Sequence, residues 1–355
     1  MKHKLFILII LCLFTTFSFA QKNEDVIVEP EPHKPEQYFK DYNPTGIKTV
    51  YIISKNKNTN FVNDTLNVEC YNKQGLKTQI IRYEKNIPAD ILDISYDEKG
   101  NRKESIYSLV KVKDRTGISR FKYDQHNQLL AEEYQSVFAG KTERTVDKKY
   151  TYDNQKLVER KIYQSNTLSQ TDSFFYNKER LVLHKQTYHT GNNNYENIYT
   201  YNGSGLLTKR ETYSYYNYNQ KNIFGKAEYS YKDDQLVYVS EMEGLNLQNN
   251  EPVHIRYDYD EKGKISKMRV EYKSFYREVT YTYDGQKIVS ICVNTNTDNS
   301  AYMKFWTSTF GNYIDKMPFD YKEEFGYDSK NNFISKKISI NDELVNEVSY
   351  IIEYY

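Results

Sequence analysis

Tyr259-Asp260-Glu261-Lys262-Gly263-Lys264-Ile265 is the stretch that best displays the pattern governing the fold of this 355-residue chain. Another aromatic residue, Tyr257, stands two positions before Tyr259, and side chains two apart project from the same face of a β-strand. Asp260 and Gly263 suit a turn, because Asp accepts hydrogen bonds from its own turn and Gly adopts positive φ without steric cost. Ile265 then opens a returning strand. The stretch therefore predicts a β-hairpin with an aromatic stripe on one face.

The same pattern recurs along the chain as an aromatic or aliphatic residue, any residue, Tyr, and then usually Asp or Asn. The second-position tyrosines are Tyr96, Tyr123, Tyr152, Tyr176, Tyr201, Tyr231, Tyr259, Tyr283 and Tyr327. Most lie 24 to 30 residues apart, a spacing typical of repeat architectures, and the last interval is 44. The sequence therefore predicts an all-β fold. We expect an antiparallel hairpin meander that forms an extended or spiralling sheet, with no significant helix beyond the N-terminal segment.

Three copies carry a family resemblance: the stretch at 259–265, Tyr-Asp-Gln-His-Asn-Gln-Leu at 123–129 and Tyr-Asp-Ser-Lys-Asn-Asn-Phe at 327–333. They resemble the tyrosine-aspartate (YD, or RHS) repeat of bacterial surface and toxin proteins. In that family the hairpins coil into a spiralling sheet, in some members a hollow shell around a toxin. This chain lacks the Asp-Pro self-cleavage motif of the toxins, and we expect no additional C-terminal toxin domain. It looks more like the small exported repeat proteins common in Bacteroidota.

The N-terminus has the order of a secretory signal over residues 1–20, with Lys2 and Lys4 before an apolar run and small residues before Gln21. We expect cleavage there and export to the periplasm, the outer surface or the medium. A span of about 20 apolar residues is needed to cross a bilayer, so no transmembrane span is expected in the mature chain.

The domain organisation follows from composition. Residues 21–46 contain four prolines and no periodicity, which predicts a flexible linker. The hairpin repeats are expected over residues 47–355, and the long interval between repeats predicts an insertion at about 289–324.

Charge and cysteine content exclude several classes of protein. Loss of Lys2 and Lys4 takes the formal net charge from +1 to −1, so no basic excess is left to attract nucleic acid. The two mature cysteines, Cys70 and Cys292, are expected to be free thiols, since a bridge would require the repeat array to bring its ends together.

Nothing in the sequence predicts a catalytic or cofactor site. His184 and His189 are the two mature histidines closest in sequence, but their odd separation points them to opposite faces of a strand, and we expect surface positions without metal. No Gly-x-Ser-x-Gly elbow occurs, and no privileged carboxylate pair stands out. We therefore expect a protein that is not an enzyme, with no catalytic residues, no metal and no cofactor.

Tyrosine is the anomaly of this composition, with 37 residues. For the second-position tyrosines we expect a structural role in cross-strand contacts. Two regions break the repeat, and their aromatic residues are candidate ligand-binding residues, with loop or cap packing as the alternative role. These candidates are Tyr213, Tyr215, Tyr216, Tyr218, Tyr302 and Trp306.

The leading functional hypothesis is an exported, non-enzymatic repeat protein that binds a glycan or protein of the cell envelope or surroundings through tyrosine-rich surfaces. A structural or toxin-associated RHS-like shell or chaperone is the second. An outer-membrane β-barrel is the third, but neighbouring charges such as Lys148 and Lys149 place charge on both faces of a strand, and the mean hydropathy of −0.84 is low.

Overall fold

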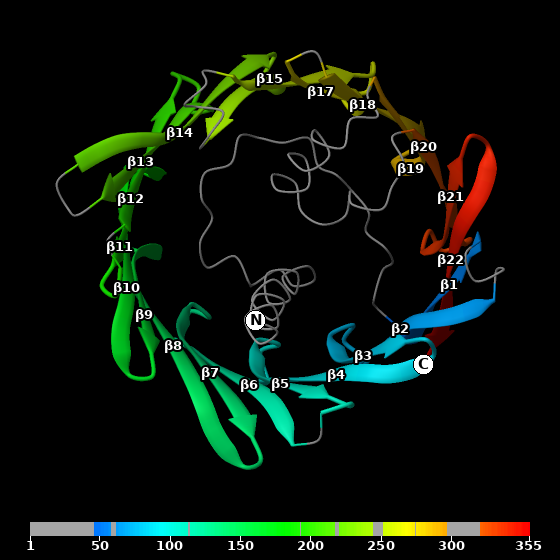
Figure 1. Ribbon diagram of the computed structural model, residues 1–355, viewed down its shortest axis with the longest axis horizontal. Helices are drawn as coiled ribbons and strands as arrows, with labels where there is room; N and C mark the ends of the chain where they lie inside the picture. Colours follow the sequence, from blue (N-terminus) through cyan, green and yellow to red (C-terminus); the bar gives the residue numbers. More distant parts are fainter. Residues whose placement is uncertain are drawn as a thin grey trace, which may run out of the picture.

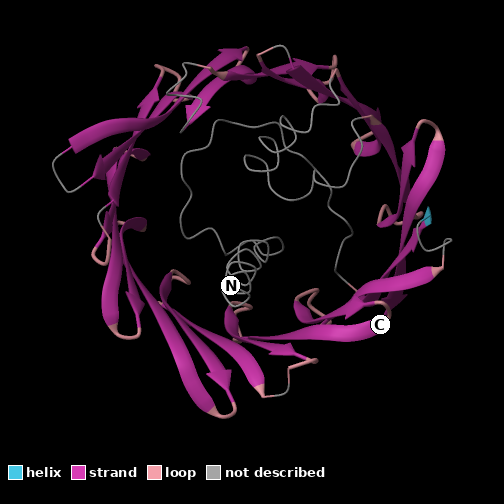
Figure 2. Cartoon of the chain, viewed as in Figure 1, coloured by secondary structure: helices cyan, strands magenta, loops and turns pink. Residues whose placement is uncertain are grey.

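The computed structural model describes residues 46–57, 62–112, 114–191, 193–216, 220–243, 251–273, 275–296 and 320–355. This part of the chain forms strands joined mostly by short turns, without an α-helix (Figure 2). In these ranges, then, no helix is long and apolar enough to cross a membrane. The strands are β1 (Ile47–Asn56), β2 (Asn63–Tyr71), β3 (Lys77–Glu84), β4 (Ile87–Tyr96), β5 (Arg102–Leu109), β6 (Arg115–Tyr123), β7 (Leu129–Phe138), β8 (Lys141–Asp153), β9 (Lys156–Gln164), β10 (Thr167–Asn177), β11 (Arg180–Tyr188), β12 (Asn193–Tyr201), β13 (Leu207–Tyr216), β14 (Gln220–Lys232), β15 (Gln235–Glu243), β16 (Val253–Tyr259), β17 (Ile265–Tyr272), β18 (Phe275–Asp284), β19 (Lys287–Thr295), β20 (Tyr321–Tyr327), β21 (Phe333–Ile340) and β22 (Glu343–Tyr354).

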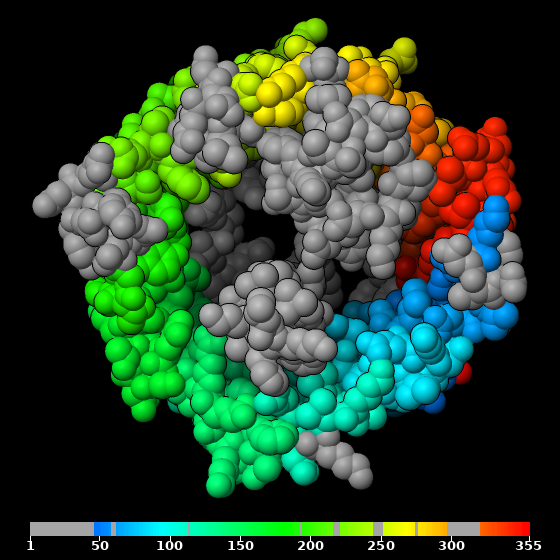
Figure 3. All heavy atoms as spheres, in the orientation of Figure 1, coloured from blue at the N-terminus to red at the C-terminus, as the bar shows by residue number. Residues whose placement is uncertain are grey.

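The sheet is closed. Each strand pairs antiparallel with its neighbours in the chain, and β1 also pairs with β22, in the register Tyr51↔Ile351 and Ile52↔Tyr350 (Figure 1). The 22 strands therefore form one barrel, in which the blue start and the red end of the described chain lie side by side (Figure 3). The all-β antiparallel meander expected from the sequence is confirmed. Its extended or spiralling form is replaced by a closed ring, which leaves no unpaired sheet edge.

The Tyr-Asp turns have the local structure that their residues favour. In the quoted hairpin, the Asp260 carboxylate oxygen Oδ1 accepts hydrogen bonds from the backbone N–H groups of Lys262 and Lys264, both at 2.9 Å. Gly263 takes φ +77°. Beyond the turn the register shifts, since Asp258 pairs with Lys267 but Tyr259 pairs with Ile265. This β-bulge holds one extra residue and reverses the alternation of side chains along the returning strand.

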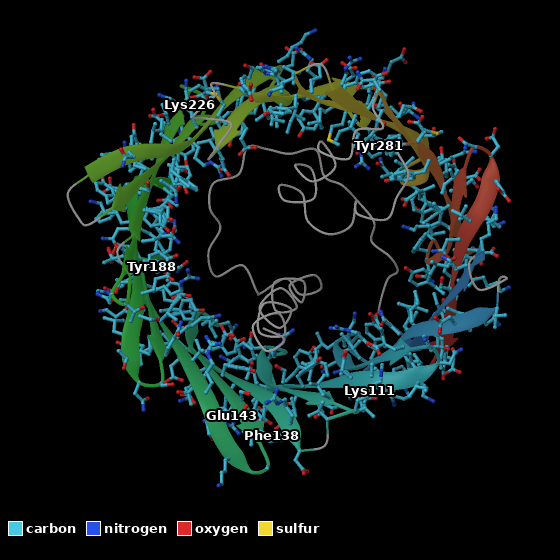
Figure 4. All side chains as sticks on the ribbon, in the orientation of Figure 1. Lys111, Phe138, Glu143, Tyr188, Lys226 and Tyr281 are labelled. Carbon is cyan, nitrogen blue, oxygen red and sulfur yellow. The ribbon has the colours of Figure 1, made fainter. Side chains whose placement is uncertain are left out.

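The inner and outer faces of the barrel wall, which is the closed sheet itself, carry different side chains. Figure 4 shows Tyr188 and Tyr281 on the inner side of the ring and Lys226 on its outer side. Alternation from these residues places the paired repeat aromatics and the buried clusters on the inner face. At β16 and β17 the core extends along the wall to Val253 and Val270, but most of this inner layer lies near the end of the barrel that carries the Tyr-Asp turns. We call this the Tyr-Asp end. Gly46 and Tyr355 also meet there, where the Tyr355 N–H donates to the Gly46 carbonyl at 3.1 Å.

Described strands lie at both ends of the interval in which an insertion is expected at about 289–324. Strand β19 continues to Thr295, and β20 begins at Tyr321 and pairs with it directly, as in Val293↔Tyr321. Residues 297–319 lie outside the described residues.

Both described cysteines are free, as expected. Cys70 lies on β2 and Cys292 on β19, so closure of the barrel still leaves β20, β21, β22 and β1 between them. Burial raises the pKa of the Cys70 thiol, and the nearby Glu353 carboxylate adds to this effect.

Candidate functional site

Eight of the second-position tyrosines connect a hairpin to the one before it through a hydrogen bond. Tyr176 Oη donates to the carbonyl oxygen of Leu157 at 2.9 Å, and Tyr201 Oη donates to that of Leu181 at 2.7 Å. The same bond recurs around the ring. The remaining pairs are Tyr96 to Lys77, Tyr152 to Leu129, Tyr231 to Leu207, Tyr259 to Leu236, Tyr283 to Ile265 and Tyr327 to Ile288. We call this set of bonds the tyrosine ladder.

The carbonyl acceptors of the tyrosine ladder lie where the backbone pairing between neighbouring hairpins ends. The pairing of β11 with β12 stops at Leu183↔Ile198, so the Leu181 carbonyl lies beyond the sheet hydrogen bonds on that side. A buried carbonyl without a partner costs about 1–3 kcal/mol, and the hydroxyl of Tyr201 supplies the missing donor. Burial raises the pKa of Tyr152 and Tyr231 to about 12, so these hydroxyls stay protonated donors at neutral pH.

An aromatic belt lines the inner wall next to the tyrosine ladder. First-position aromatics such as Phe174 and Tyr199, which are 4% and 3% exposed, pack against the leucines that open the returning strands. On the other side of the ring, Phe325 and Phe333 pack together with ring centroids 5.8 Å apart. Each of these repeats therefore contributes a first-position residue and the apolar residue that opens its returning strand to a layer shared with its neighbours, which explains the sequence pattern.

Charged pairs lie on the inner wall farther from the Tyr-Asp end. Each joins residues on adjacent or nearby strands whose side chains share the inner face, as the register requires. They are Arg82–Asp90 at 3.6 Å, Lys148–Glu132 at 2.8 Å, Arg160–Asp172 at 2.9 Å, Arg210–Glu241 at 2.6 Å and Lys336–Glu323 at 2.9 Å. The inner wall thus combines an apolar belt with side chains of both charges.

Asp172 is the most buried charged group of this wall, with 0% exposure. Its Oδ2 accepts a hydrogen bond from Arg160 Nε at 2.9 Å, and its Oδ1 lies 3.1 Å from His184 Nε2. Burial acts to raise the pKa of the Asp172 carboxyl, but the His184 hydrogen bond and the Arg160 charge outweigh burial and hold that pKa below its usual value. The cluster is therefore a satisfied ionic centre inside the wall.

His184 corrects one expectation. It is 2% exposed and stacks on Phe174 with ring centroids 4.5 Å apart, so the surface position expected from the sequence is wrong. The register shift between Tyr176↔Leu181 and Phe175↔Leu183 is the reason, because simple alternation from Leu181 would have pointed His184 outward. Being so enclosed, its imidazole is poorly placed to meet a substrate. Across the described ranges, no group of three or more His, Cys, Asp or Glu residues is placed to hold a metal ion.

Two of the candidate ligand-binding tyrosines lie away from the inner wall. Tyr213 and Tyr215 are on the outer face of β13, where the Lys221 ammonium stands 4.1 Å and 5.6 Å from their ring centroids. The Tyr215 hydroxyl donates to Glu196. Their faces are thus already in contact with a cation. Tyr216 pairs through its backbone at the end of β13, and its side chain lies outside the described residues, as do Tyr218, Tyr302 and Trp306.

Other tyrosines, which sequence reasoning missed, face inward beyond the belt. Tyr107 has its pKa raised to about 12 by burial and by the charge of Asp90, with which it hydrogen-bonds. Tyr134 packs over Gly117, where an added Cβ would lie only 3.1 Å from its hydroxyl. The Tyr188 ring contacts the Tyr195 ring edge to face, with ring centroids 6.2 Å apart. Alternation along the strands could have indicated them, but only with the bulges placed correctly.

No protein-family model matches the chain, and no curated protein matches it. Among solved structures, it is similar to TcdB2-TccC3-TEV, with 12% identity and a TM-score of 0.38 over 81% of this chain and 16% of that chain. It is also similar to a porin-like protein from Bacteroides uniformis, with 7% identity and a TM-score of 0.30 over 88% of this chain and 100% of the other. A porin-like protein from Bacteroides vulgatus gives 11% identity and a TM-score of 0.24 over 88% and 99%. The chain spans about a sixth of the first of these structures, and all three likenesses are too distant to assign a family or a function.

Proposed function

We propose that this chain is an exported, non-enzymatic barrel that binds a polypeptide of the cell envelope or the surroundings against its inner wall. The observation that carries the proposal is the composition of that wall, an aromatic belt next to charged pairs of both signs on one closed face. Aromatic side chains supply contact area at low entropic cost, and the charged pairs provide partners for side chains of either sign. This mixture suits a polypeptide, which carries all of these groups.

A glycan is the second candidate ligand, because tyrosine rings also stack against sugars. The inner tyrosines beyond the belt favour it, since Tyr107 on β5 and Tyr134 on β7 both face inward beside β6, and Tyr188 faces inward on β11. A glycan would stack against these rings and form hydrogen bonds with their hydroxyls, but an uncharged sugar would form no ion pairs with the charged side chains. The two candidates therefore predict different sensitivity to salt.

The outer-membrane barrel is less well supported. A closed antiparallel barrel with an even number of strands meets one requirement of that class. However, the outer face carries ion pairs along most of its circumference, and each Lys or Arg at the middle of a bilayer costs about 2–4 kcal/mol. These pairs include Lys122–Glu133, Lys161–Glu159, Lys185–Glu196, Lys209–Glu211, Lys267–Glu278 and Lys322–Glu324. An exterior in contact with water is the better fit.

The function is tested by capturing ligands from solubilised envelope of the source cells with immobilised residues 21–355. The captured material is treated with protease before elution, and retained protein and glycan are scored separately. We expect a polypeptide that stays intact while bound and is digested after denaturation of the barrel. Tyr188→Ala, on the inner wall, should reduce capture several-fold, whereas Tyr163→Ala, on the outer face, should leave it unchanged.

Capture that is equally sensitive to both substitutions, or a bound polypeptide that is digested at once, contradicts binding at the inner wall. Glycan without protein, retained at high salt, would favour the second candidate. Enrichment of the folded chain in detergent micelles with no captured ligand would favour the membrane barrel.

A further inference from the structure

Two arginines of the inner wall lie close together near the end of the barrel opposite the Tyr-Asp end. Arg115 begins β6, and Arg144 on β8 pairs with Ser136 of β7. On the other side of β7, Ser136 pairs with Gly117. Alternation from the inward-facing Tyr134 therefore places both arginines on the inner face. We call Arg115, Tyr134, Ser136 and Arg144 the arginine cluster.

The Tyr134 hydroxyl stands near both arginines. Its ring lies over Gly117, where an added Cβ would be 3.1 Å from the hydroxyl oxygen, so the glycine makes room for it. Burial raises the pKa of Tyr134, whereas a hydrogen bond with Ser136 and the charges of the two arginines act to lower it. Positive charges favour the ionised hydroxyl in this way only when they are close to it. Both guanidinium groups therefore face the same hydroxyl.

The arginine cluster has more donors than the described residues satisfy. Carboxylates pair with three other arginines of the inner wall, namely Arg82, Arg160 and Arg210. In the described part of the chain, by contrast, Arg144 pairs with no carboxylate. Arg115 Nη2 lies 3.3 Å from Glu143, but its Nε–H is buried and finds no acceptor among the described residues. Because a buried donor without an acceptor is unfavourable, the cluster suits an anion that is supplied from outside the chain.

We propose that the arginine cluster binds a carboxylate of the polypeptide that the barrel holds against its inner wall. This inference rests on the function proposed above and names a group that the polypeptide presents. Guanidinium groups bind carboxylates through paired N–H···O bonds. The hydrogen bond between Tyr134 and Ser136 uses one of their two hydroxyl protons, so the other is free to donate to the same anion. Two guanidinium charges against the one carboxylate of Glu143 leave an excess of one positive charge.

The arginine cluster is also accessible and held in place. Arg144 is exposed, and Arg115 is the first residue of its strand, so both lie near the opening of the barrel. The Arg115 guanidinium carbon stands 5.1 Å from the ring centroid of Phe138, which Figure 4 labels beside Glu143 on the hairpin of β7 and β8. Stacking on a ring orients the guanidinium plane and leaves the N–H groups at its edge available. A carboxylate that enters through this opening therefore meets oriented donors.

Fluorescence anisotropy of residues 21–355 with labelled peptides tests the proposal. The first peptide repeats Gly-Tyr-Glu and is capped at both ends, the second has Gln in place of each Glu, and the third is the Gln peptide with a free C-terminal carboxylate. The wild type should bind the Glu peptide about tenfold more tightly than the capped Gln peptide. Arg144→Gln should abolish this preference. Arg120→Gln, which removes an arginine from the outer face of β6, is the matched control and should keep it. Tight binding of the third peptide alone would assign the site to a C-terminal carboxylate.

Equal affinity for all three peptides overturns the carboxylate site and leaves the binding of a polypeptide in place. A preference that Arg120→Gln and Arg144→Gln lower equally also overturns the site. If none of the peptides binds, the tyrosine fluorescence of the protein is followed during titration with N-acetylglutamate. A change that Arg144→Gln abolishes would support the site although the proposed function fails, and no change would overturn both. Thermal unfolding of each variant checks that the barrel is intact.

Discussion

Replacing Asp172 by Ala should lower the free energy of unfolding by about 3–5 kcal/mol, because it removes the buried carboxylate that pairs with the partly buried Arg160 guanidinium and accepts from the His184 ring. Urea unfolding followed by circular dichroism measures this loss. Glu159→Ala breaks the Lys161–Glu159 pair, whose side chains are 38% and 33% exposed, and should cost under about 1 kcal/mol. Equal losses for the two variants would contradict a buried ionic centre.

The Asp172 carboxyl should also make the free energy of unfolding depend on pH. Since the folded pKa of Asp172 lies below its unfolded value of 3.8, its contribution to stability is fully present above that value and is lost as the pH falls through the lower folded pKa. The wild type should therefore lose stability on acidification below about pH 4 more steeply than Asp172→Ala. Parallel acid titrations of the two proteins measure the difference, and identical curves would contradict the assignment.

The second large effect is expected from the tyrosine ladder. A triple substitution of Tyr176, Tyr201 and Tyr231 by Phe keeps the rings but removes three hydroxyls that donate to the carbonyls of Leu157, Leu181 and Leu207. At about 1–3 kcal/mol for each unsatisfied carbonyl, the combined loss should be about 3–9 kcal/mol.

The matched control replaces three outward-facing tyrosines, Tyr163, Tyr213 and Tyr276, by Phe. Their rings lie under Lys149, Lys221 and Arg269, so the control keeps the cation–ring contacts and should lose under about 1 kcal/mol in total. Chemical denaturation of both triple variants measures the two losses in free energy of unfolding. A ladder variant as stable as the control would show that the hydroxyls do not stabilise the contact between hairpins.

The hairpins could be predicted from the sequence because their determinants are local. Aromatic residues two apart, an Asp that accepts from its own turn, and a Gly at positive φ all lie within the nine residues from Tyr257 to Ile265. Closure is not local. It depends on the pairing of β1 with β22 across almost the whole chain, and on the curvature that accumulates from the twist and bulges of every strand.

The candidate site was harder to predict for the same reason. The acceptor of each ladder tyrosine is a backbone carbonyl, which leaves no mark on the sequence. It lies from 18 residues away, for Tyr283 and Ile265, to 39 residues away, for Tyr327 and Ile288. Tyr213 and Tyr215 stood out by composition, yet they face outward. The bulge after each turn also shifts the alternation, which hid the inward position of His184.

The most direct test of the closed barrel is a disulfide across the junction of β1 and β22. Ile53 pairs with Ser349 on the outer face, and such cross-strand Cα atoms lie about 4.5–5.5 Å apart, within reach of a disulfide. The protein would carry Ile53→Cys and Ser349→Cys, with Cys70→Ser and Cys292→Ser to remove the native thiols. Ile53→Cys with Ser335→Cys, one strand farther away, is the control.

After mild oxidation at low protein concentration, mass spectrometry of the tryptic peptides identifies the link. The closed barrel predicts a nearly complete bond within one chain between positions 53 and 349, and none between positions 53 and 335. Free thiols, or links only between chains, would contradict closure and would leave the repeats as an open sheet.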